Sequence, residues 1–297
     1  MTAPDLPQGT RSEWITDKLL RGLITGVLRL PYEQRVRFMG TAMRRVIGPI
    51  TGYRKRAIAN LAMIYPQMPD SEQRRVADAV CDNFGRTLIE NYSWNDLGRR
   101  LQNTAITGEG LLHLEQAAAE GRPVIFVTGH FANHEVPRHM LTQLGYTIGG
   151  LYRPMSNQYF NAHYAKTMTA WGGPVFEQGR RGTAGFVRHL KSGGMATLLF
   201  DVAGLQGQPM PFLGRQANTS MSAADLALKT GALILPYFAT RQPDGLSFAA
   251  TLQAPIAHSS SQKMMQDMTE RLEAQITIHP EQWFWVHRRW KHAGQAV

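Results

Sequence analysis

The chain has 297 residues, a formal net charge of +10 and one cysteine, Cys81. It is long enough to bury a sizeable core, and no Pro/Ser/Gly linker, repeat or low-complexity tract divides its sequence, which indicates one domain. The single cysteine excludes an internal disulfide framework and a multi-cysteine zinc site, while the positive charge predicts an anionic partner such as a phospholipid surface, a phosphorylated substrate, an acidic protein or nucleic acid.

The first predicted element is an amphipathic helix that begins at Ser12 and has an apolar stripe from Trp14 to Leu28. Basic residues flank the stripe at Lys18, Arg21 and Arg29. An aromatic residue at headgroup depth with cations beside it is typical of a helix that lies on an anionic membrane surface. The alternative is an ordinary amphipathic helix that packs on the core. The apolar stretch from Leu19 to Leu30 is interrupted by Arg21 and Arg29 and is shorter than the ~20 apolar residues that span a bilayer, so we expect a peripheral or monotopic association.

Basic residues continue after this helix, at Arg35, Arg37, Arg44, Arg45, Arg54, Lys55 and Arg56. Each alone is typical of a solvated surface, but their joint bias predicts a docking face. Helices are predicted over residues 53–65 and 70–90, the second capped by Ser71 and carrying Cys81 as a core residue. We therefore expect residues 1–100 to be a helical, membrane-docking segment and residues 101–297 to be the α/β catalytic core of the same domain.

The next informative stretch is a short apolar run from Val124 to Val127, which predicts a strand buried on both faces of a helix-covered sheet. Directly after it come His130, Asn133, His134 and Glu135. Ionisable residues at the carboxyl end of a core strand occupy the place where open α/β sheets bind ligands. Asn133 is also a suitable cap for a helix that carries Glu135 in its first turn.

His130 and Glu135 are the predicted catalytic pair. An imidazole takes a proton from a hydroxyl group and returns it, and a nearby carboxylate fixes its tautomer and stabilises the imidazolium. The chain reverses between the two residues, so a hydrogen bond between them is plausible. The spacing alone is equally compatible with a glutamate that starts a helix beside a polar turn, and the preceding strand favours the catalytic interpretation.

Two later strands also end at charged residues. Residues 146–151 lead to Arg153, and residues 195–200 lead to Asp201, while Arg180 opens the helix to Lys191. If these strands are parallel, His130, Arg153 and Asp201 lie at one edge of the sheet. The predicted fold is therefore a mixed, mainly parallel α/β sheet covered by helices. Residues 201–208 are rich in glycine and predict a loop.

The remaining chain predicts helices over residues 223–229 and 261–278 and strands over residues 233–238 and 246–252. The tail over residues 283–292 alternates aromatic and basic side chains, which suits a lipid-facing rim or an anionic headgroup. No nucleic-acid module surrounds it, so a nucleic-acid partner is not expected.

Together these segments resemble the lipid A biosynthesis (late) acyltransferase family, within the glycerolipid-type acyltransferases that carry a His-x4-Asp/Glu motif. The resemblance covers roughly residues 14–291. It rests on GHFANHE after the apolar strand and on further segments in the same order, namely Tyr152-Arg153-Pro154 with Asn157, Arg180 followed by Leu190-Lys191-Ser192-Gly193, Asp201, Pro211-Phe212-Leu213-Gly214, and Trp285-Val286-His287-Arg288-Arg289-Trp290-Lys291. One departure is His134, where relatives often have an apolar residue or tryptophan, and this bears on the substrate more than on the reaction.

The resemblance implies a membrane-associated O-acyltransferase at the cytoplasmic face of the bacterial inner membrane. The donor would be an acyl-acyl carrier protein or acyl-CoA, the acceptor a phosphorylated, partly acylated lipid A precursor, and no resident cofactor or metal is implied. His130 would be the general base and Glu135 its partner. Arg153, Arg180, Asp201 and Arg288 are the candidate substrate-binding residues. A lyso-aminolipid or lysophospholipid acceptor is the close alternative, with the same chemistry.

Two alternatives come from other classes of protein. A metal hydrolase would use His130, His134 and His139 with Glu135, but the sequence has no His-Glu-x-x-His arrangement. A non-catalytic membrane-binding or nucleic-acid-binding module would explain the charge and leave the ionisable strand ends unexplained.

Overall fold

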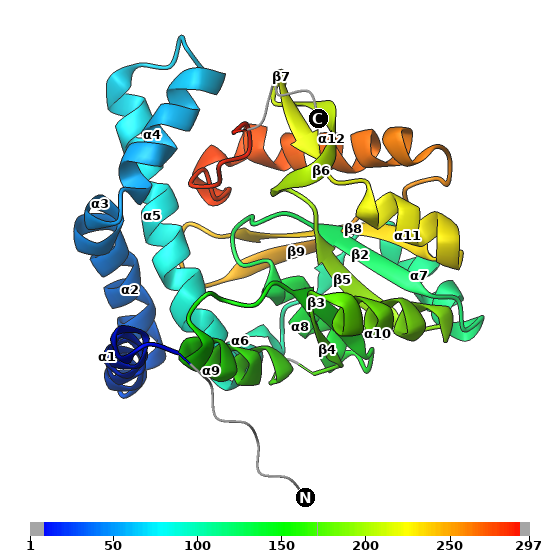
Figure 1. Ribbon diagram of the computed structural model, residues 1–297, viewed down its shortest axis with the longest axis horizontal. Helices are drawn as coiled ribbons and strands as arrows, with labels where there is room; N and C mark the ends of the chain where they lie inside the picture. The colour runs from blue at the N-terminus through cyan, green and yellow to red at the C-terminus, as the bar shows by residue number, and fades with distance from the viewer. Residues whose placement is uncertain (1–8, 171, 292–297) are drawn as a thin grey trace, which may run out of the picture.

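A seven-stranded sheet in the order β1-β9-β8-β2-β5-β3-β4 forms the centre of the computed structural model, which describes residues 9–170 and 172–291 (Figure 1). The strands are β1 (Ile106–Thr107), β9 (Phe248–Leu252), β8 (Leu233–Arg241), β2 (Val124–Thr128), β5 (Met195–Leu199), β3 (Ile148–Tyr152) and β4 (Val175–Glu177). β8, β2, β5, β3 and β4 run parallel, whereas β9 pairs antiparallel with β8. The predicted mixed, mainly parallel fold is confirmed.

Helices cover the sheet and extend beside it. The N-terminal ones are α1 (Arg11–Leu28), α2 (Tyr32–Ala42), the π-helix η1 (Met43–Ile47), α3 (Gly48–Ile50), α4 (Tyr53–Ile64), α5 (Asp70–Tyr92) and α6 (Trp94–Leu101). The others are α7 (Gly110–Ala119), α8 (Glu135–Gln143), α9 (Gln158–Thr169), α10 (Arg180–Lys191), α11 (Ser222–Thr230), α12 (Ser261–Ile278) and the 3-10 helix η2 (Pro280–Gln282). Figure 1 shows α2, α4 and α5 as a column beside the sheet.

Strand β2 is buried on both faces, as its apolar run predicts. Ile125 and Val127 belong to the core that α10, α11 and α12 cover, and Val124 and Phe126 belong to the core that α7 and α8 cover. Residues that alternate along a strand point to opposite faces, so a continuous apolar run is the pattern required here.

The parallel register brings three strand ends to one edge. Thr128 of β2 pairs with Leu199 of β5, and Gly150 of β3 pairs with Thr197 of β5. Because parallel strands end at the same side of a sheet, the residues that follow β2, β5 and β3 emerge there together. The predicted common edge for His130, Asp201 and Arg153 is confirmed.

The glycine-rich stretch after Asp201 is not a loop, contrary to the prediction. It forms β6 (Ala203–Phe212), which pairs antiparallel with β7 (Arg215–Thr219) with a register shift between Ala203 and Gln208. A Cβ atom at Gly207 would lie 2.7 Å from the backbone carbonyl carbon of Thr219. Glycine here permits a close approach between two backbones. A glycine-rich composition by itself does not distinguish a strand of this kind from a loop.

The N-terminal helix follows the prediction closely. Thr10 and Glu13 form a capping box at the start of α1, and the helix buries Ile24 and Val27. Its outward face leaves Leu19 69% and Leu23 46% exposed. Among the described residues, no helix is long and apolar enough to cross a membrane. The predicted Ser71 cap is wrong, because α5 begins at Asp70 with no side-chain cap.

Cys81 is buried in α5, as expected for a core residue. Burial raises the pKa of its thiol to about 11. The thiolate is therefore scarce at neutral pH, which excludes Cys81 as a nucleophile there.

Candidate active site

The turn after β2 carries the predicted base. A Cβ atom at Gly129 would lie 2.7 Å from a methyl carbon of Leu272 and 3.0 Å from Asp201 Oδ2, so a larger residue before His130 would have to displace one of these side chains. Two residues later, Ala132 adopts the left-handed conformation, with φ of 43°. The segment after η2 lies against this turn, because the Phe284 amide donates to the His130 carbonyl at 2.9 Å and Phe131 bridges to Trp283.

Asp201 is the carboxylate that contacts His130. Its Oδ1 lies 2.8 Å from His130 Nδ1, and its Oδ2 accepts the His130 backbone N–H at 2.8 Å. Trp283 Nε1 donates to the same Oδ2 at 2.8 Å. The Asp201 side chain is 0% exposed, whereas that of His130 is 30% exposed. An ionised acceptor at Nδ1 favours the tautomer with its proton there, which leaves Nε2 with a free lone pair.

The electrostatics of Asp201 suit this role. Burial by itself raises the pKa of the Asp201 carboxyl group, but the nearby charge and hydrogen bonds of His130 outweigh burial and hold the pKa below its ordinary range. The carboxylate is therefore ionised at neutral pH. A buried anion at 2.8 Å from Nδ1 stabilises the imidazolium that forms when His130 takes up a proton.

Two further histidines flank His130. The ring centroid of His287 lies 4.4 Å and that of His134 lies 5.3 Å from the His130 ring. Burial, with a smaller contribution from nearby His130, lowers the pKa of His287 to about 3 and that of His134 to about 4. Both rings are therefore neutral at physiological pH, so they add no positive charge beside the base.

Glu135 does not make the predicted hydrogen bond with His130. It is the first residue of α8, and its Oε2 accepts from Arg138 Nη1 at 3.3 Å, while its Oε1 lies 3.9 Å from His134 Nε2. The left-handed residue at 132 redirects the chain before α8, and the helix then places Arg138, three positions later, on the same face. Asn133 does accept the Glu135 backbone N–H, at 3.2 Å, in the predicted capping contact.

The interpretation of Asp201 as a substrate ligand is also wrong. Both of its carboxylate oxygens accept hydrogen bonds from the protein, and the residue is fully buried. A carboxylate in this state has no free face for a substrate. Its burial and its partners instead make it the orienting group for His130.

The predicted cationic ligands lie on the surface. Arg153, Arg180 and Arg288 are all exposed. Within the described part of the chain, none of the three side chains forms an ion pair or a hydrogen bond with His130. Arg153 does follow the predicted edge strand. The proposed roles of these arginines in substrate binding stay predictions.

Sequence reasoning did not assign roles to Trp283, His287 or Arg289. The tail that contains them stood out only by composition, and nothing in its pattern separates the buried side chains from the exposed Arg288. Arg289 is 1% exposed and donates to the Asn218 carbonyl at 2.7 Å and to Thr219 Oγ1 at 2.6 Å. Arg289 therefore anchors β7 and has a structural function, although it stands next to the exposed Arg288 in the sequence.

A metal site would draw on a different set of ligands from the predicted one. Among the described residues, His130, Asp201 and His287 alone present a group of ligand atoms, all within 4.8 Å of one another. His139 and Glu135 are not in that group. The one carboxylate in it already accepts hydrogen bonds at both oxygens, so this donor set fits an oriented histidine better than a metal centre.

These features define a class of protein: an α/β protein with a carboxylate-bound histidine at the carboxyl edge of a parallel sheet. The chain belongs to the bacterial lipid A biosynthesis acyltransferase family, whose model it matches over residues 10–292. It is therefore an acyltransferase, and the predicted family and enzyme class are confirmed. The metal hydrolase and the non-catalytic module are wrong as alternatives.

Curated relatives align with this chain over most of its length. The lipid A biosynthesis lauroyltransferase of Escherichia coli (strain K12) is 24% identical over 290 residues, which cover 93% of this chain and 91% of that protein. The lipid A biosynthesis palmitoleoyltransferase of the same strain is 26% identical over 274 residues, covering 89% and 87%. A lipid A biosynthesis acyltransferase of Haemophilus influenzae is 24% identical over 241 residues, covering 78% and 74%.

The two neutral histidines make the stability of the fold depend on pH. Because burial lowers the pKa of His287 to about 3 and of His134 to about 4, from an ordinary 6.5, the unfolded chain binds more protons below pH ~6.5. The free energy of unfolding should therefore fall by about 1–3 kcal/mol per histidine as the pH drops from about 7 toward about 4. Urea unfolding over this range measures the slope. His287→Gln should flatten it, and equal slopes in variant and wild type would contradict the assignment.

Proposed function

We propose that the protein transfers a fatty acyl chain from an acyl thioester to a hydroxyl group of a membrane lipid, with a lipid A precursor as acceptor. The observation that carries the proposal is the His130 imidazole, bound at Nδ1 by buried Asp201 while its side chain remains 30% exposed. The names of the relatives, a lauroyltransferase and a palmitoleoyltransferase of lipid A biosynthesis, support this acceptor.

The transfer proceeds without an acyl-enzyme. His130 Nε2 removes the proton of the acceptor hydroxyl as its oxygen attacks the thioester carbonyl carbon, and the Asp201 carboxylate stabilises the imidazolium. The tetrahedral intermediate collapses, the carbon–sulfur bond breaks, and the imidazolium returns its proton to the thiolate. The products are an ester and a free thiol, so atoms and charge balance, and neither a cofactor nor a metal takes part.

The donor is an acyl-acyl carrier protein or acyl-CoA. Both are anionic, and the chain carries a formal net charge of +10. Arg153, Arg180 and Arg288 are exposed and available to hold acceptor or donor phosphates. Arg153 is the first candidate because it follows β3, whose end lies at the same sheet edge as His130.

The protein docks on the cytoplasmic face of the inner membrane through α1. The helix exposes Ile15, Leu19 and Leu23 at four-residue spacing, and Lys18 and Arg21 lie beside them. Exposed apolar side chains continue on α2, η1 and α3, at Phe38, Val46 and Ile50. Figure 1 places α2 and α3 on the same side of the molecule as α1. An apolar stripe with a basic margin suits an anionic bilayer.

Two basic residues that were predicted for the docking face are engaged elsewhere. Arg35 is buried and pairs with Asp96, and Arg54 pairs with Asp78. Arg37 and Arg45 remain exposed. The cationic part of the docking face is therefore smaller than the sequence indicates.

The first test is an acyl-transfer assay in detergent, with mass spectrometry of the products. Acyl-acyl carrier protein and acyl-CoA are offered with a lipid A precursor and a panel of lyso-aminolipids and lysophospholipids. We expect transfer to the lipid A precursor, and His130→Ala should lower kcat by about 10²- to 10⁴-fold with the fold intact. Transfer to another lipid alone would move the acceptor to the close alternative, and full activity of the variant would refute the mechanism.

The second test compares the two carboxylates. Asp201→Asn removes the anion at Nδ1 and should lower kcat by about 10³-fold or more, because the amide also permits the wrong tautomer. Glu135→Gln keeps a hydrogen-bond acceptor for Arg138 and should lower kcat by no more than about tenfold. Steady-state kinetics of the two variants give the comparison. The reverse order of effects would assign the partner role to Glu135.

The third test addresses membrane docking. Leu19→Glu with Leu23→Glu should weaken binding to phosphatidylglycerol vesicles by about 100-fold or more, because each leucine contributes about 1.5–3 kcal/mol when it leaves water. Both side chains are exposed, so the fold should survive. Leu112→Glu is the matched control, since Leu112 is 71% exposed on α7. Vesicle sedimentation measures binding. Equal binding of all three proteins would exclude docking through α1.

A further inference from the structure

The turn that carries His130 needs support from its surroundings. Ala132 has φ of 43° and is 5% exposed. An L-residue with a Cβ atom rarely adopts the left-handed region, and such a conformation persists where neighbouring groups hold it. The groups that contact residues 131–133 are therefore candidates for holding the turn in this conformation.

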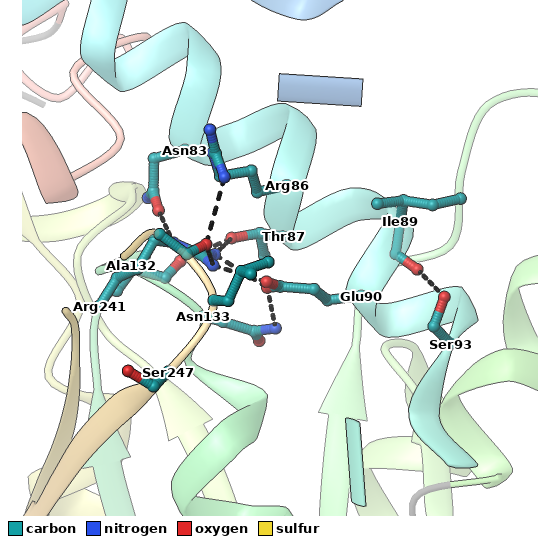
Figure 2. A network of polar contacts seen from close by, with 12 residues as sticks. Asn83, Arg86, Thr87, Ile89, Glu90, Ser93, Ala132, Asn133, Arg241 and Ser247 are labelled. Carbon is teal, nitrogen blue, oxygen red and sulfur yellow. Dashed lines mark hydrogen bonds and ion pairs between the residues drawn. The ribbon is translucent and has the colours of Figure 1, made fainter. Parts of the chain in front are cut away.

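A buried ion pair lies beside this turn (Figure 2). Arg241 at the end of β8 donates from Nη1 to Glu90 Oε1 at 2.5 Å and from Nη2 to Glu90 Oε2 at 2.8 Å. Glu90 in α5 is 0% and Arg241 is 8% exposed. Asn83 Oδ1 accepts from Arg241 Nε at 2.7 Å, and the Gly245 carbonyl accepts from Nη1 at 3.1 Å. The guanidinium thus has protein acceptors on every side.

The pair reaches the turn through two side chains. Asn133 Nδ2 donates to Glu90 Oε2 at 3.0 Å, and Thr87 Oγ1 donates to the Ala132 carbonyl at 3.0 Å. Arg241 Nη2 in turn donates to Thr87 Oγ1 at 3.3 Å. Figure 2 shows α5 presenting Thr87 and Glu90 toward Ala132 and Asn133.

Gln282 closes the arrangement from the other side. Its carbonyl accepts the Ala132 N–H at 2.7 Å. Its side chain accepts the Arg241 N–H at 2.8 Å and donates to the Arg241 carbonyl at 2.9 Å. Both backbone polar groups of Ala132 are therefore tied to elements that also hold Arg241.

We propose that Glu90 and Arg241 are positioning residues for acyl transfer, which clamp residues 131–133 and thereby hold His130 in its hydrogen bond with Asp201. The inference rests on the proposed function of His130. A buried ion pair is a poor source of stability compared with apolar residues of the same volume, and its well-attested use is to select one arrangement. Here the selected arrangement is the left-handed turn next to the base.

The decisive variant is Glu90→Leu with Arg241→Met, which removes both charges and leaves no buried ion unpaired. We expect its Tm to stay close to that of wild type, while kcat falls by about 100-fold and KM changes by less than about threefold, because the base is displaced and substrate binding is not. ¹⁵N NMR of the histidine side chains, with His130 assigned by His130→Ala, should show loss of the single Nδ1–H tautomer.

Variants that change only one of the two side chains linking the ion pair to the turn test the proposal even if the double variant fails to fold. Thr87→Val and Asn133→Leu leave the contacts between Glu90 and Arg241 intact. The first removes the hydrogen bonds of Thr87 Oγ1 with the Ala132 carbonyl and with Arg241, and the second removes the bond to Glu90 and the cap of the Glu135 N–H. Each should lower kcat by about fivefold or more, the equivalent of one net hydrogen bond. Wild-type kcat in both would overturn the proposal.

The control is Leu114→Ala in α7, which is fully buried and whose apolar side chain takes no part in the hydrogen bonds that hold the turn. It should lower Tm and leave kcat and the His130 spectrum unchanged. The proposal is overturned if the double variant keeps wild-type kcat and spectrum, or if Leu114→Ala loses kcat equally, since activity would then follow stability. Absence of transfer by wild type would refute the proposed function instead, and the NMR readout would still test the clamp.

Discussion

Burial of the Asp201 carboxylate is the constraint on which the site depends. An ionised group that leaves water must receive hydrogen bonds from the protein, and here the donors are the backbone and ring of His130 and the indole of Trp283. These three groups come from the turn after β2 and from the segment after η2, while Asp201 itself follows β5. One carboxylate therefore joins two neighbouring strand ends to the C-terminal part of the chain.

A second buried carboxylate, Glu90, lies on the other side of the same turn. Asp201 receives donors from His130, and Glu90 receives them from Arg241 and Asn133. The turn between them is thus held by two anions with different tasks. In the mechanism proposed above, one orients the imidazole and stabilises its charged form, and the other fixes the backbone that carries it. Neutral His134 and His287 complete the surroundings without adding charge.

Much of the fold followed from local pattern. The apolar run at residues 124–127, the helix over residues 180–191 and the amphipathic helix over residues 261–278 all appear where periodicity places them. The sheet edge shared by His130, Arg153 and Asp201 could also be predicted from the sequence, because parallel strands end on the same side of a sheet. The structure of the stretch after Asp201 could not be predicted in this way, because its glycines are compatible both with a loop and with a close backbone approach between β6 and β7.

The sequence by itself determined the family and the strand end at which His130 lies, because an apolar strand followed by His130 is a local pattern. The tertiary structure alone decided which carboxylate contacts the His130 ring. Asp201 is 71 positions away from His130 and Glu135 only five, but sequence distance carries no information once strands pair in parallel. In the same way, nothing local to Glu90 or Arg241 reveals their pairing, since the contact joins a helix and a strand 151 positions apart.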